Sequence, residues 1–118
     1  MHPNTFKKQG LICQRQHDAS VNIPQILPCL HSPDGFEWGY GGSGPADLAR
    51  NVVEKVLRTS GFEGPKARRN GKLQPQFEMT DRIYQDFKWN VIANIPPEGG
   101  VIPYETLLAE VTRLIDAK

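Results

Sequence analysis

The stretch Gly39-Tyr40-Gly41-Gly42-Ser43-Gly44 has the residue types and spacing that most directly point to chemistry. It fits the pattern G-x-G-x-x-G and stands between a predicted strand and a helix that Pro45 is expected to begin. A helix start leaves backbone N–H groups without acceptors and carries partial positive charge, and glycine lets an anion approach that backbone. We therefore expect phosphate binding at Gly41, Gly42, Ser43 and Gly44 and at the N–H groups of Ala46 and Asp47.

The sequence around this loop excludes three familiar sites. The dinucleotide-binding fold needs a buried parallel strand before the loop and another after the helix, whereas residues 59–65 are predicted to be a loop. No lysine follows Gly44, as a Walker A loop requires. Pro45 occupies the position where a nucleophile elbow around Ser43 would have glycine, so we do not expect catalysis by this serine. Glycines selected for packing alone are the competing explanation.

An aromatic series leads into the loop. Phe36, Trp38 and Tyr40 recur with a period of two, which in a strand places the three rings on one face. Aromatic rings stack on nucleobases, so Trp38 or Tyr40 would complement a phosphate held by the loop. We expect Phe36 in the core, and core packing is the alternative for the other two rings.

Two further candidates lie later in the chain. Arg68 and Arg69 belong to the basic cluster of residues 66–72 and would complete a phosphate clamp, although a solvated surface loop is the competing interpretation. Asn90 in a predicted helix has an amide that can pair with a base edge, or it simply faces solvent.

Other residues have the types of a metal or hydrolytic site but not the spacing. Cys13, His17, Cys29 and His31 could supply zinc ligands, yet their spacing is not that of zinc knuckles. Residues His31, Ser32 and Asp34 fall within one turn, where triad geometry is rarely reached. A hydrolase or nuclease built on His17, His31 and Asp34 is the least favoured hypothesis, because no carboxylate cluster for a metal is apparent.

Length and composition limit the class of protein. The chain of 118 residues, with 38% hydrophobic and 23% charged residues, predicts one folded domain over residues 1–118 and suggests no cofactor. A net charge of +1 argues against a nucleic-acid partner. We see neither a membrane-length apolar run nor a signal peptide, and the two cysteines do not make a disulfide scaffold, so we expect a cytoplasmic location.

The order of predicted elements is strands first and helices after. Short strands are expected at 11–16 and 19–30, and a hairpin is expected to pair roughly 21–31 with 36–40 across the turn at 32–35. Helices are expected at 45–58, with Gly61 as the stop, at 81–94, with Thr80 as N-cap, and at 103–117. We expect residues 1–10 to be flexible and 61–78 to be a polar loop. This order predicts an α+β fold in which about three helices pack on one face of a small antiparallel sheet.

The string from His31 to Ala49 resembles a family of small phage, prophage and bacterial proteins of unknown function that share F-x-W-G-Y-G-G-S-G-P-A-x-L-A. The segment from Tyr84 to Ala93 looks like a second block of that family, and the resemblance covers about residues 30–117. Size, element order and motif are also similar to phage anti-defence sponge proteins of the Thoeris anti-defence type 1 kind. That similarity implies a non-enzymatic homo-oligomer that holds cyclic ADP-ribose isomers, and sometimes cyclic oligonucleotides, at subunit interfaces.

The leading hypothesis is therefore a non-enzymatic protein that sequesters a small cyclic nucleotide signal, in the host cytoplasm if a phage encodes it. The alternative is an inhibitor or adaptor that binds a host defence enzyme, which the small size and the lack of a convincing catalytic set would also explain.

Overall fold

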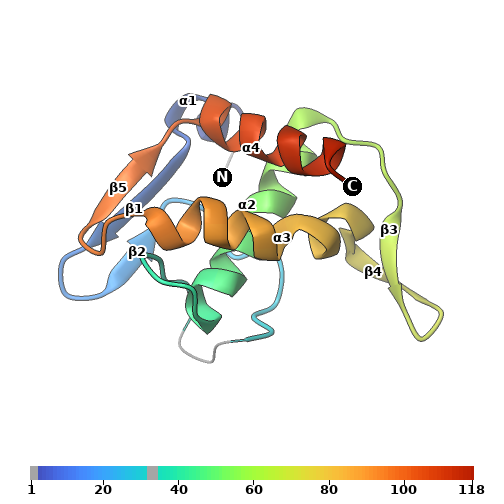
Figure 1. Ribbon diagram of the computed structural model, residues 1–118, viewed down its shortest axis with the longest axis horizontal. Coiled ribbons are helices and arrows are strands. Elements are labelled where there is room, and N and C mark those ends of the chain that lie inside the picture. The colour runs from blue at the N-terminus through green and yellow to red at the C-terminus, as the bar shows by residue number, and fades with distance from the viewer. Residues whose placement is uncertain (1–2, 32–34) are drawn as a thin grey trace.

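The computed structural model describes residues 3–31 and 35–118. An α+β arrangement is confirmed: small antiparallel sheets accompany the helices α1 (Pro3–Gln9), α2 (Ser43–Ser60), α3 (Glu78–Asn90) and α4 (Tyr104–Asp116). The long helix α2 runs through the middle of the molecule, with α3 and α4 on one side and the sheets at its edges (Figure 1). None of the helices in the described part of the chain is long and apolar enough to cross a membrane.

Two separate sheets form, and the second was not predicted. In the first, β1 (Leu11–Arg15) lies between β2 (Ala19–Val21) and β5 (Gly99–Ile102), all antiparallel. In the second, β3 (Lys66–Arg69) pairs with β4 (Lys72–Phe77) inside the segment expected to be loop. Asn70 and Gly71 join them with φ of 52° and 78°, the positive values of a tight type I′ hairpin turn.

The predicted helix at 45–58 is confirmed as the interior of α2. Gly61 ends it in the left-handed conformation, as expected, and returns its N–H to the carbonyl of Arg58. The helix predicted at 103–117 is confirmed as α4. The middle helix was predicted to start three residues too late, because Thr80 is not its cap but lies inside α3 and faces α2; a short 3₁₀ turn, η1 (Ile92–Asn94), follows.

The N-terminus is more ordered than predicted. Residues 3–9 form α1 instead of a flexible lead-in, and Phe6 is fully buried. The Phe6 ring packs edge-on against Tyr104 at the start of α4, with ring centroids 5.4 Å apart. Docking of one aromatic ring fixes this short helix.

The hairpin predicted between 21–31 and 36–40 is absent from the described residues, and the turn at 32–34 lies outside them. Strand β2 ends at Val21, and residues 22–31, which we call the strap, cross α2 without strand pairing. Pro24 and Pro28 interrupt this segment, and proline donates no ladder hydrogen bond. Residues 36–40 likewise form no strand.

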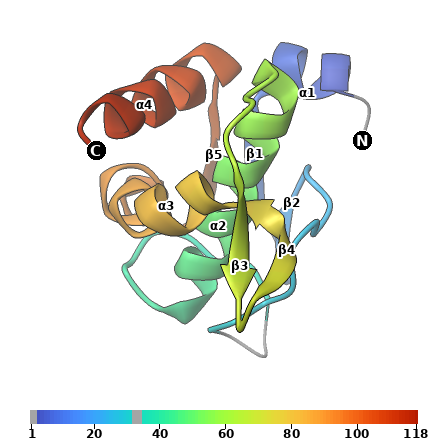
Figure 2. The ribbon, with the colours of Figure 1, turned by 90° about the vertical axis from the view of Figure 1, so that its right-hand side faces the viewer.

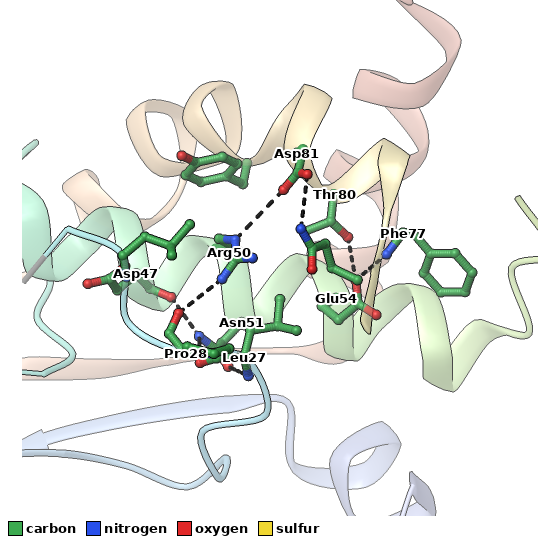
Figure 3. Close-up of polar contacts among 12 residues, drawn as sticks. Leu27, Pro28, Asp47, Arg50, Asn51, Glu54, Phe77, Thr80 and Asp81 are labelled. Carbon is green, nitrogen blue, oxygen red and sulfur yellow. Dashed lines mark hydrogen bonds and ion pairs between the residues drawn. The ribbon is translucent and has the colours of Figure 1, made fainter. Parts of the chain in front are cut away.

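Side chains of α2 hold the strap in place of a neighbouring strand (Figure 3). The Oδ1 atom of Asn51 accepts the backbone N–H groups of Ile26 and Leu27, each at 2.8 Å. One turn earlier, the carboxylate of Asp47 accepts the N–H groups of Leu30, at 2.9 Å, and His31, at 3.2 Å. Both α2 side chains are fully buried, so the strap satisfies its backbone against the helix.

The same face of α2 holds the start of α3. Glu54 is fully buried, and its Oε1 accepts the N–H of Phe77 at 3.0 Å and the hydroxyl of Thr80 at 2.7 Å. Its Oε2 accepts Nε of Arg58 at 2.7 Å, which compensates the buried charge. Asp47, Asn51 and Glu54 thus form, with Arg50, a buried polar row at helical spacing (47, 50, 51, 54), which we call the polar face of α2.

We predict that Asn51→Ala lowers the free energy of unfolding by about 3 kcal/mol, because it strips acceptors from two backbone N–H groups in the interior. Urea unfolding followed by circular dichroism measures this. The matched control, Asn90→Ala, removes an exposed amide and should cost less than about 0.5 kcal/mol. Equal losses in the two variants would contradict the role given to the polar face.

Candidate functional site

The glycine-rich loop is shaped by close packing at two positions. Gly39 has φ of +87° and donates its N–H to the carbonyl of Ile92 at 3.0 Å, which turns the chain toward α2. A Cβ on Gly41 would lie 2.0 Å from Cη2 of Trp89, so the indole ring rests directly on the loop backbone. The packing explanation therefore accounts for these two glycines.

Lys88 ties the loop to the end of α3. Its Nζ donates to the carbonyl of Gly41 at 3.1 Å and lies 4.5 Å from the centre of the Trp89 ring. The side chain is 7% exposed, so its positive charge sits beside the loop with little water around it. The loop, the cation and the indole ring make one rigid corner of the surface.

The start of α2 has fewer available N–H groups than predicted. Ala46 is buried and its N–H donates to the carbonyl of Gly42 at 3.1 Å, within the helix. Asp47 is fully buried, so its N–H group is enclosed, and its carboxylate accepts N–H groups of the strap. Both residues therefore have structural roles, which corrects their assignment to the ligand. Ser43 and Gly44 are the first two residues of α2, where N–H groups have no intrahelical acceptor. Ser43 is exposed, whereas Gly44 is buried, which corrects the assignment of Gly44 to the ligand.

Trp38 is a core residue, which corrects its assignment as a stacking ring. It is 1% exposed and donates Nε1–H to the carbonyl of Pro96 at 3.0 Å. The guanidinium of Arg15 covers its ring at 4.5 Å from the centroid. No face of this indole is left for a base, whereas Phe36, expected in the core, is partly buried and packs against the edge of the core.

Two aromatic rings do remain at the surface beside the loop. Tyr40 is 52% exposed, and its ring lies so close to Gly42 that an added Cβ would be 2.4 Å from Cε2. Trp89 is 58% exposed and covers Gly41. We call Tyr40, Gly41, Gly42 and Trp89 the aromatic platform. Trp89 was not among the ligand-binding residues predicted from the sequence. It lies two residues after the core residue Phe87, and in a helix this spacing turns a side chain away from the apolar face, which was the available signal.

Arg68, Arg69 and Asn90 do not join the loop. The hairpin of β3 and β4 lies beside the beginning of α3, whereas the loop contacts its end (Figures 1 and 2). A helix of this length spans about 20 Å, so the arginines are too distant to form one clamp with the glycines. Asn90 donates to Oε2 of Glu110 in α4 at 2.9 Å. The residues that were predicted to form one ligand site therefore lie in separate parts of the surface.

The carboxylate of Glu37, beside the start of α2, is paired with a cation. A Cβ on Gly44 would lie 2.7 Å from Cβ of Glu37, and Glu37 pairs through both oxygens with Nη1 and Nη2 of Arg15. The hydrogen bond from Arg15 is the main reason that the pKa of Glu37 lies below its ordinary value. An anion at Ser43 would therefore face a carboxylate whose charge is already paired.

The described residues that were considered for a zinc site or for hydrolysis do not come together in one site. Cys13 is buried in β1, and burial raises the pKa of its thiol to about 12. The pKa of Cys29 is also raised, first by burial and then by Asp47. Nε2 of His31 lies 2.9 Å from the hydroxyl of Tyr84, and Ser32 and Asp34 fall outside the described residues. In residues 3–31 and 35–118, no three His, Cys, Asp or Glu side chains gather as a metal site.

Fold and loop together define a small α+β protein whose central helix begins at a glycine-rich surface loop. The chain belongs to the DUF6166 family, a family of unknown function, whose profile matches residues 6–68. The match includes residues 6–29, which precede the expected span of 30–117, and ends before the segment from Tyr84 to Ala93. No curated protein and no solved structure gave a match.

We predict that Gly41→Ala displaces the Trp89 indole, because the new methyl group would overlap the ring. Nitrogen-15 NMR should show the Trp89 indole N–H resonance shifting while that of buried Trp38 changes little. Gly100→Ala is the control, since its Cβ would have nothing nearer than 3.8 Å. An unchanged Trp89 resonance in Gly41→Ala would contradict the described packing.

We predict a pH-dependent contribution of Glu37 to stability. Because its pKa is lowered in the folded chain, the stabilisation is present above its ordinary pKa of 4.5 and is lost as pH falls through the lower folded value. The difference in unfolding free energy between wild type and Glu37→Gln should thus be constant at neutral pH and shrink in acid. Glu98→Gln, at an exposed position, should show no such trend; a difference for Glu37→Gln that grows in acid would refute the sign.

Proposed function

We propose that this protein is a non-enzymatic binding protein for a small phosphorylated nucleotide, held at the aromatic platform and the start of α2. The observation that carries the proposal is the pair of exposed rings, Tyr40 and Trp89, lying on the backbone of Gly41 and Gly42 where a helix begins. Exposed rings of this size are suited to stacking on a base, and the helix start is suited to an anion.

In this proposal each group has a distinct role. Trp89 or Tyr40 stacks on the base, and the first-turn N–H group of Ser43, which is exposed, donates to a phosphate. Lys88, whose Nζ is 3.1 Å from the Gly41 carbonyl, adds positive potential beside the phosphate without leaving its structural bond.

Binding is favoured over catalysis because the nearby ionisable groups already have structural partners. Glu37 is paired with Arg15, Lys88 with the Gly41 carbonyl, and His31 with Tyr84. A general acid or base needs to reach a substrate proton, and these groups are committed elsewhere.

The finer proposal is sequestration of a cyclic nucleotide immune signal, such as a cyclic ADP-ribose isomer, by a cytoplasmic homo-oligomer of phage origin. It rests on the resemblance in size, element order and motif. The division of the predicted clamp is compatible with it, because a second subunit could supply cations that the loop lacks within one chain.

The second candidate is a protein inhibitor or adaptor. The same exposed rings support it, since tyrosine and tryptophan are enriched at the centres of protein interfaces. In that case the platform contacts a protein side chain and not a base.

We predict that a bound nucleotide raises the melting temperature. A ligand at one hundred times its Kd stabilises the fold by about 2.7 kcal/mol, or roughly 10 °C for a chain of this size. Differential scanning fluorimetry against cyclic ADP-ribose isomers, cyclic oligonucleotides and linear nucleotides measures this. Trp89→Ala should weaken binding by about tenfold or more, since one stacked base contributes about 1–3 kcal/mol.

Val101→Ala is the matched control, because Val101 is as exposed as Trp89 but lies on β5. It should leave nucleotide affinity unchanged. A flat response across the whole panel, together with a Trp89-dependent complex with a host protein, would replace the nucleotide proposal by the inhibitor proposal.

A further inference from the structure

A small cavity lies between the strap, α2 and the second sheet, away from the aromatic platform. Its volume is about 160 Å³, enough for one compact group and no base. Leu30 and Pro28 of the strap, Gln74 and Gln76 of β4, and the two arginines Arg50 and Arg69 line it. It shares no residue with the platform.

Arg50 at this cavity is buried with few partners. The residue is 3% exposed, and its Nη1 donates to the carbonyl of Pro28 at 3.0 Å. Its Nε has no hydrogen-bond acceptor, and the nearest carboxylate oxygen, Oδ1 of Asp81, is 3.7 Å away (Figure 3). A guanidinium donates through every nitrogen, and here the buried Nε is left without an acceptor.

Asp81 compensates this charge only in part. Its side chain is exposed, and its Oδ2 accepts Nε2 of Gln76 at 3.1 Å. A buried charge whose counter-ion is beyond hydrogen-bond distance is costly to the fold. Buried polar groups nearly always have a hydrogen-bond partner, so an unpaired buried guanidinium nitrogen points to an acceptor from outside the chain.

Arg69 supplies a second cation from the solvent side. It is exposed on β3 and lines the cavity, whereas its neighbour Arg68 donates to the carbonyl of Gly71 in its own hairpin. Two guanidinium groups at one small cavity are the donor set that recognises a phosphate or carboxylate.

We infer that this cavity binds a compact oxyanion, the phosphate or carboxylate group of a small molecule, between Arg50 and Arg69. The oxyanion supplies the acceptor that Nε of Arg50 lacks, and the apolar side chain of Leu30 at the rim accommodates the organic part of the ligand. This inference goes beyond the proposed function, since the cavity and the platform are separate and either can be occupied alone.

Titration with inorganic phosphate, acetate and chloride at matched ionic strength, followed by NMR of the Arg50 guanidinium N–H resonances, tests the inference. Phosphate or acetate should shift these resonances saturably, and the stronger of the two identifies the class of oxyanion. Chloride should give only a small linear drift. Saturable shifts with neither oxyanion, or equal shifts with chloride, would overturn the inference.

The two neighbouring arginines provide a charge-matched pair of variants. Arg69→Gln should weaken oxyanion binding by about tenfold, whereas Arg68→Gln, which removes the same charge from the same strand, should change it less than about twofold. Equal weakening by both would indicate general screening and overturn the inference. Both positions are exposed, so the comparison does not depend on a buried substitution that disturbs the fold, and Trp89→Ala should leave this binding unchanged.

Discussion

The buried polar face of α2 is the constraint on which the rest of the molecule depends. A helix in the middle of a small protein would ordinarily be apolar all round, but this one carries Asp47, Arg50, Asn51 and Glu54 in its interior row. Asp47 and Asn51 accept backbone N–H groups of the strap, which has no strand partner there, and Glu54 accepts the N–H of Phe77 at the end of β4. The helix thereby replaces a sheet as the element that satisfies the strap and the entry to α3.

This constraint also positions the surface that we assign to function. With Glu54 fixing the first turn of α3 and Lys88 fixing its last, α3 lies antiparallel along α2 and delivers Trp89 onto Gly41. Position 41 is glycine because any side chain there would overlap the Trp89 ring. The ring stays exposed because the backbone of Gly41 lies directly beneath it. The residues that shape the loop are thus also the candidate binding residues. For this reason the loop could be recognised as unusual from the sequence, but its role could not be assigned from the sequence alone.

Sequence reasoning succeeded where the signal is local. The apolar stripe from Leu48 to Leu57, with Pro45 near the start and Gly61 after the end, predicts α2 without further information. The hairpin of β3 and β4 also had a local signal, because Asn70-Gly71 is typical of a hairpin turn. The charged residues around this pair led us to predict a loop instead.

The errors arose where distant residues decide the conformation. The strand predicted at 19–30 ends at Val21, and Asn51, far along the chain, accepts the N–H groups of Ile26 and Leu27 that a longer strand would have paired. Likewise Asp47 was expected to offer its N–H to a ligand, and nothing in its neighbours revealed that its carboxylate would be buried against the strap. For the candidate site, Tyr40 and the glycines were found from sequence, whereas Trp89 required knowledge of which helix crosses the loop.

Native-state hydrogen exchange of the strap tests the central claim most directly, because it reads the backbone N–H groups that the polar face holds. The N–H groups of Ile26, Leu27 and Leu30 belong to no helix or strand, yet they should exchange as slowly as those in the middle of α2, through global unfolding alone. Fast exchange of these three groups in the intact protein would contradict the account.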